Sequence, residues 1–257
     1  SGGNIIANNI TLRGGDAVIN DTLTIASSFT AQGGITIRDF ATVTLNSSGG
    51  DITLSTFDGN ILMNNDVTSV SLTDSANDVI IDANDANNDN TGDDINIGAD
   101  ITGANTNGGT VGSDLTLHAE GFVTVGGTIS LIDGQGNGDL IIAADNDNNT
   151  IETISITGSL TNLNSLDVTG GSGASQNEDF TLSNTINVPG AVSITQLGDF
   201  IITDTTNITS SGSSITINNI DNSITFQGSS TINAQNGALD MATNVTGNGI
   251  LLAGTGE

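Results

Sequence analysis

The feature that most constrains this chain is a short pattern that recurs along its whole length: an apolar residue, a Thr or Ser, and a second apolar residue. Alternate side chains of an extended segment lie on opposite faces, so each triplet is typical of a three-residue strand with two apolar side chains on one face. No segment keeps a period of 3.6 residues, which excludes a mainly helical fold. Examples occur at 10–12, 23–25, 35–37, 43–45, 52–54, 115–117, 154–156, 192–194, 215–217 and 224–226.

The spacing of the triplets predicts how these strands are arranged. Between Val43 and Val79 the triplets begin at intervals of nine residues, and Gly, Asn, Asp and Ser fill the gaps. Such residues tolerate tight turns, so each gap is predicted to be a corner. An isolated three-residue strand cannot bury its apolar pair, whereas stacked coils bury a continuous column. We therefore expect an all-β parallel solenoid with two or three strands per coil and roughly ten coils, about 4.8 Å apart, in a rod on the order of 50 Å long.

Three polar segments interrupt the triplets, near 82–94, 103–113 and 170–179. Triplets resume directly on either side of each one. We interpret these segments as loops that leave a coil, and the whole of 1–257 as one solenoid domain.

The composition limits the classes of molecule that this chain can bind. The chain has 29 acidic residues and 2 basic ones, a formal charge of −27, and no Cys. Nucleic acids and anionic lipids bind proteins largely through Lys and Arg, so both classes are excluded. No apolar run approaches the ~20 residues that span a bilayer, so no membrane insertion is expected. The chain begins SGGNII without Met, which indicates a mature product or a segment of a longer protein.

A calcium-binding site is the most specific site hypothesis that the sequence offers. Ca²⁺ takes six to eight oxygen ligands from carboxylates and carbonyls, which Asp-rich loops provide. The simpler interpretation is that these acids are solvated corners that keep the rod soluble. No cofactor is required by either interpretation. The candidate ligands are Asp82, Asp85, Asp89, Asp93 and Asp94, with a second cluster at Asp145 and Asp147.

An enzyme is a weaker hypothesis, raised because polysaccharide lyases and galacturonases use β-helices and carry Asp clusters beside a catalytic Arg, Lys or His. The candidates for that role are His118, Arg13 and Arg38. The sequence offers no further catalytic motif, and a lone His at a strand end is typical of a polar surface residue. We therefore predict a non-catalytic protein.

The segments at 50–54 (GDITL), 33–37 (GGITI) and 213–217 (SSITI) resemble repeats of filamentous-haemagglutinin-type bacterial exoproteins. The resemblance extends over almost the entire chain. It implies a right-handed parallel β-helix, an adhesive shaft, and a location outside the cell or on the bacterial surface.

These observations lead to one functional prediction and two alternatives. We expect a structural or adhesive shaft segment of a secreted bacterial surface protein or extracellular fibre. Its partners would be other copies stacked head to tail or the remainder of a longer chain, with glycans and host or cell surfaces as further candidates. The alternatives are a calcium-dependent carbohydrate-binding module and a β-helical polysaccharide lyase.

Overall fold

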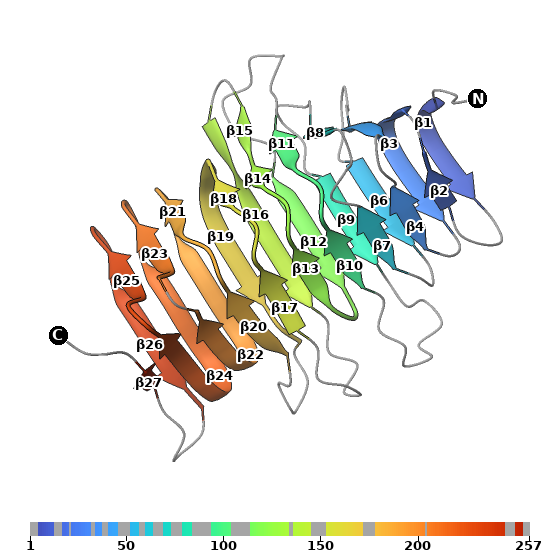
Figure 1. The fold of residues 1–257 in the computed structure, drawn as a ribbon. Helices are drawn as coiled ribbons and strands as arrows, with labels where there is room; N and C mark the ends of the chain where they lie inside the picture. Colours follow the sequence, from blue (N-terminus) through green and yellow to red (C-terminus); the bar gives the residue numbers. More distant parts are fainter. Residues whose placement is uncertain are drawn as a thin grey trace.

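The fold is a stack of short, mainly parallel strands that wind around a common axis (Figure 1). The described residues form 27 strands and no helix, so the predicted all-β parallel solenoid is confirmed. The computed structural model describes residues 5–12, 17–20, 22–31, 34–37, 41–45, 52–56, 60–63, 69–72, 79–83, 94–103, 114–133, 136–144, 153–171, 178–203, 205–244 and 250–253.

The strands form three faces, numbered in the order in which the chain meets them. Face 1 contains the first halves of β1 (Ile5–Leu12) and β3 (Thr22–Ala31), then β5 (Thr42–Leu45), β8 (Ser69–Leu72), β11 (Ile101–Gly103), β14 (Ile129–Ser130), β18 (Leu160–Thr161), β21 (Ile186–Val188), β23 (Asn207–Ser210) and β25 (Thr231–Ala234). Face 2 contains the second halves of β1 and β3, then β6 (Ile52–Thr56), β9 (Val79–Ala83), β12 (Leu115–Ala119), β16 (Gly136–Ala144), β19 (Leu163–Thr169), the first halves of β22 (Val192–Ile202) and β24 (Ile215–Gln227), and β26 (Leu239–Thr243). Face 3 contains β2 (Ala17–Ile19), β4 (Ile35–Ile37), β7 (Ile61–Met63), β10 (Ile95–Ile97), β13 (Val123–Val125), β17 (Thr153–Ile156), β20 (Asp179–Leu182), the second halves of β22 and β24, and β27 (Ile250–Ala253).

The pairing register explains the nine-residue spacing of the triplets. Val43 pairs with Val70 on face 1, and Ile52 pairs with Val79 on face 2, each 27 positions later in the sequence. Three triplets nine residues apart therefore make one coil, with one strand on each face. Of the two coil designs that the sequence left open, the structure adopts the one with three strands. Each face connects ten successive layers through its pairings.

The interior is a narrow column of the triplets' apolar side chains. Phe180 and Phe200 lie on adjacent layers and stack with their ring centroids 5.1 Å apart and their planes inclined by 19°. Because each strand presents only two or three inward positions, Ile, Leu and Val fill the column with few aromatic residues. On face 3 the fully buried row consists of Ile35, Ile61, Ile95, Val123, Ile154, Phe180, Phe200 and Ile224.

The corner between face 3 and face 1 is held by paired hydrogen bonds to a single carbonyl. Gly126 and Gly127 both donate their backbone N–H groups to Ile97 O, at 2.8 and 3.1 Å. One layer further on, Thr157 and Gly158 donate in the same way to Val125 O, at 2.9 and 3.0 Å. The last carbonyl of each strand therefore fixes the turn of the next layer.

The long strands β22 and β24 pass through a corner without interruption. Gln196 and Asn219 have φ values of 58° and 54° and lie between the two halves of these strands. A single left-handed residue redirects an extended chain. The pairing register shifts just after Gln196, between Leu197 and Asp199, and around Asn219, between Ile217 and Ile220. One pair departs from the parallel pattern: β15 (Ile132–Asp133) runs antiparallel to the start of β16.

The polar segments near 82–94, 103–113 and 170–179 lie largely outside the described residues. Where the chain is described beside them, β9 to β12 and β19 to β20 belong to the same three faces. The number of residues in a coil varies: on face 3, Ala17 pairs with Ile35 and Ile61 pairs with Ile95, which are 18 and 34 positions apart. Neighbouring layers stay in register across this range.

Candidate functional site

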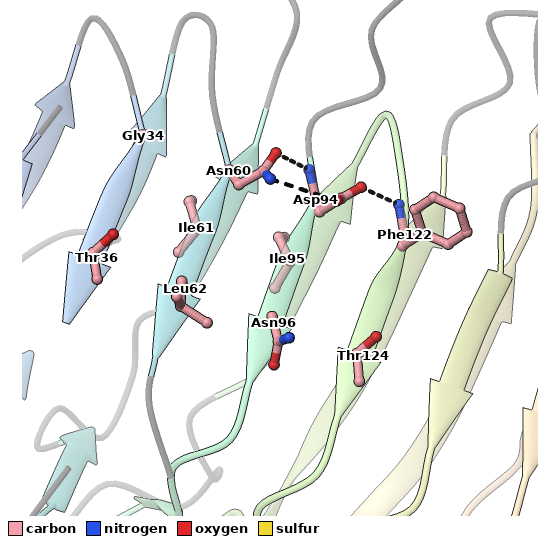
Figure 2. Close-up of a pocket in the computed structure, with 10 residues that line it drawn as sticks. All are labelled: Gly34, Thr36, Asn60, Ile61, Leu62, Asp94, Ile95, Asn96, Phe122 and Thr124. Atoms are coloured by element: carbon pink, nitrogen blue, oxygen red, sulfur yellow. Dashed lines mark hydrogen bonds between the residues drawn. The ribbon is translucent and has the colours of Figure 1, made fainter. Parts of the chain in front are cut away.

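The residue directly before a strand forms hydrogen bonds along the solenoid axis. Asn60 precedes β7, and its Oδ1 accepts the backbone N–H of Asp94, which precedes β10, at 2.9 Å. The Oδ1 of Asp94 accepts the N–H of Phe122, which precedes β13, at 2.8 Å. Figure 2 shows the three residues in one row across the coils. Side chains thus extend the backbone ladder into the corner.

A similar contact recurs elsewhere, at the residue directly before the first inward-facing residue of a triplet, which gives several of the abundant Asp residues a structural role. A carboxylate that accepts a backbone N–H forms a charge-assisted bond, stronger than a neutral one. The acids at these corners are therefore more than a solvated surface. The contacts run from Thr128 N to Asp100 Oδ1 (2.7 Å), from Asp139 N to Asp114 Oδ1 (2.7 Å), from Asp199 N to Asp179 Oδ1 (2.9 Å), from Asn207 N to Thr185 Oγ1 (3.3 Å) and from Ala238 N to Ser214 Oγ (3.2 Å).

On face 3 these corner residues border a groove with a volume of about 520 Å³ (Figure 2). Two rows of residues, two positions apart along the strands, line it. The first row is Gly34, Asn60, Asp94 and Phe122, and the second, in register across β4, β7, β10 and β13, is Thr36, Leu62, Asn96 and Thr124. We call this hollow the face 3 groove.

The chemistry of the face 3 groove combines one aromatic ring with several hydrogen-bonding groups. Phe122 leaves 43% of its surface exposed, whereas Phe29, Phe180 and Phe200 are buried. Asn96 is exposed, and the side chains of Thr36, Asn96 and Thr124 make no hydrogen bond to any other described residue. The groove can therefore offer a ring face, hydroxyls, an amide and a carboxylate to one ligand.

The carboxylate of Asp94 lies half-buried in this row. The loss of hydration on burial raises the pKa of Asp94, and the hydrogen bond from Phe122 N offsets part of that rise. Its Oδ2 has a long contact of 3.5 Å from Asn60 Nδ2. One carboxylate oxygen is therefore committed to the axial bond, and the other is only weakly engaged.

This pKa shift predicts a pH-dependent difference between wild type and Asp94→Asn. A carboxyl with a raised folded-state pKa stabilises the fold most below its unfolded pKa, and that contribution is lost as pH rises through the folded pKa. Asn keeps an oxygen that can accept the Phe122 N–H but carries no charge. The difference in melting temperature, Asp94→Asn minus wild type, should therefore increase from pH 3 to pH 6. Thermal unfolding followed by circular dichroism measures it.

Asp179 allows the same pH-dependence test at a second position on face 3. Burial raises its pKa, its bond from Asp199 N lowers it, and the nearby Asp199 carboxylate raises it further. Asp179→Asn should change in the same direction over the same pH interval. A constant difference between variant and wild type at both positions would contradict this account.

The calcium hypothesis falls mostly outside the described residues. Asp85, Asp89, Asp93, Asp145 and Asp147 are not described. Asp82 and Asp94 are described, and they lie on different faces with different partners. Within the described part of the chain, no three His, Cys, Asp or Glu side chains are grouped to hold a metal ion. Calcium binding by the loops stays a prediction.

His118 pairs with one of the proposed calcium ligands. It lies on β12 beside Asp82 of β9, and its Nδ1 donates to Asp82 Oδ1 at 2.9 Å. Their side chains are 34% and 25% exposed, so the pair lies on the outer surface of face 2. Arg13 and Arg38, the other residues of the lyase hypothesis, lie outside the described residues.

Sequence reasoning missed the grouping of Asn60, Asp94 and Phe122. The members are 34 and 28 positions apart, so the length of two coils has to be known before they can be aligned. A signal was available, since a polar residue stands directly before many triplets. Only the coil lengths were missing.

Comparison with protein-family models, with curated proteins and with solved structures finds no match for this chain. The resemblance to filamentous-haemagglutinin-type repeats therefore remains a prediction from the triplets. No helix among the described residues is long and apolar enough to cross a membrane.

Proposed function

We propose that this chain is a non-catalytic shaft, a structural and adhesive segment of a secreted bacterial surface protein or extracellular fibre. The observation that carries this proposal is the axial ladder. Parallel pairings connect the layers of all three faces, and side chains at the corners add further bonds in the same direction.

The ladder suits a load-bearing role. Each layer contacts mainly the layers before and after it, so the stability of the stack is approximately a sum over neighbouring layers. The hydrogen bonds run along the axis while the apolar column fills the centre. Such a rod lengthens by adding layers, without any change in its cross-section.

The ends of the described stack support a partner along the axis. Ile5 and Leu239 occupy inward positions, and the residues paired with them, Leu23 and Ile215, are fully buried. Ile5 and Leu239 are nevertheless 44% and 45% exposed. Exposed inward side chains and open strand edges favour further layers. The partner would be more of the same chain or another copy stacked head to tail.

The surface charge fits an extracellular shaft. A formal charge of −27 keeps neighbouring shafts apart at low ionic strength, and salt screens that repulsion. Localisation outside the cell or on its surface is part of the proposal. Antibodies against the chain should label intact cells of the source organism.

Single-molecule force spectroscopy tests the shaft directly. When the chain is pulled by its ends, the layers should detach one at a time, because each is held by its neighbours. Coils of 18 to 36 residues should give length increments of about 6 to 12 nm. Release of the whole chain in one step would contradict the proposal.

Electron microscopy of the purified chain provides the complementary test. Rods or fibres of uniform width are expected, and compact particles without an axis would contradict a shaft. Images with and without millimolar Ca²⁺ would show whether the Asp-rich loops act in contacts between copies.

Release of unsaturated products from polygalacturonate would instead support the lyase hypothesis.

A further inference from the structure

We propose that the face 3 groove is a binding site for a short, neutral oligosaccharide. The inference goes beyond the shaft function and does not depend on it. A shaft that binds no sugar would leave the proposal above intact.

The shape of the face 3 groove suits a short chain of sugar rings. Its two rows extend across four successive strands, β4, β7, β10 and β13. Three layer spacings of about 4.8 Å give a length of about 14 Å, more than one ring requires. A volume of about 520 Å³ lies within the usual range of small-molecule sites.

Phe122 supplies the apolar contact. One face of a pyranose ring presents C–H groups, which pack on an aromatic ring. Phe122 is exposed at one end of the groove, and its backbone is held by the bond from its N–H to Asp94. The ring is therefore available, and the backbone that carries it is held by the bond to Asp94.

The polar groups of the groove suit sugar hydroxyls. Asp94 Oδ2 can accept a hydrogen bond from a sugar hydroxyl, and the Asn96 amide can both donate and accept hydrogen bonds. The hydroxyls of Thr36 and Thr124 lie in the same register row as Asn96. The side chains of Thr36, Asn96 and Thr124 form no hydrogen bond to other described residues, and Asp94 Oδ2 has only the long contact from Asn60 Nδ2, so a ligand would break no short hydrogen bond among them.

The charge of the chain selects the class of sugar. A carboxylate in the groove and a formal charge of −27 disfavour uronic acids and sulfated sugars. The backbone of β4, β7, β10 and β13 is already paired on both sides, which disfavours an added peptide strand. A neutral oligosaccharide remains the ligand with the best match.

The test is saturation-transfer NMR and calorimetry of the full chain with tetramers of β-1,4-linked glucose and of N-acetylglucosamine. We expect low-millimolar or tighter binding of at least one of them, unchanged by EDTA, and no comparable binding of tetragalacturonate. Phe122→Ala should weaken binding at least about tenfold, whereas Phe122→Tyr should retain it.

Matched controls separate binding from folding. Asp94→Ala should weaken binding, whereas Asp179→Ala, which loses the same kind of axial bond outside the groove, should not. Leu239→Ala removes an equally exposed apolar side chain elsewhere. The inference fails if neither tetramer binds, if Phe122→Ala binds like wild type, or if Asp179→Ala is as defective as Asp94→Ala.

Discussion

Gly158→Ala should destabilise the solenoid by about 3 kcal/mol or more. An added Cβ at Gly158 would lie well inside van der Waals contact of the carbonyl oxygen of Gly127 in the neighbouring layer. Neither backbone segment is free to move, because both residues donate their N–H groups to a fixed strand carbonyl. Glycine is needed here for the close approach of two backbones.

The matched control is Gly126→Ala at the same corner one layer earlier. The nearest atom to an added Cβ at Gly126 is Ile97 O, at 3.8 Å, an ordinary contact. This variant should stay within about 0.5 kcal/mol of wild type in urea denaturation. Hydrogen exchange should localise the damage of Gly158→Ala to β13, β14, β17 and β18. Equal stability of the two alanine variants would show that the corner backbone yields easily.

Phe200→Ala should cost about 3 to 5 kcal/mol of unfolding free energy. Its ring is fully buried and stacks on Phe180, so truncation removes contacts on two layers and leaves a cavity in a narrow column. The thin core has no second layer of side chains that could move in to fill the space.

Phe122→Ala is the control for the loss of an aromatic ring. Because Phe122 is exposed, this variant should lose less than about 1 kcal/mol of unfolding free energy.

Since each layer depends on its neighbours, Phe200→Ala should also accelerate hydrogen exchange in β20, β22 and β24 before the rest of the chain. A uniform change over all layers would mean that the solenoid unfolds as one cooperative unit.

The alternation within triplets was sufficient to predict the fold and its core. Ile35 and Ile37 flank Thr36 in the sequence, and the structure buries both apolar residues and leaves the threonine partly exposed. The nine-residue interval also indicates the length of a coil, because three such intervals separate Val43 from its partner Val70. Local periodicity determines these features, so the sequence alone suffices for them.

The candidate site depended on information that the sequence does not display. Asp94 stands beside Asp93 in the chain, which suggested a shared calcium site, yet its described contacts are with Asn60 and Phe122 on neighbouring layers. Proximity along the chain is a poor guide where loops of different length separate the strands. Which residues meet across layers is decided by those lengths.

The variation from 18 to 36 residues per coil has a consequence for how such a protein can evolve. Pairing register and loop length are separate variables, since the strands on both sides of a long coil still meet their partners. A peptide grafted into a loop would therefore be displayed at a fixed height along the rod without disturbing the layers above and below. The solenoid is in this sense a display scaffold, on which surface variety can accumulate while the column beneath stays the same.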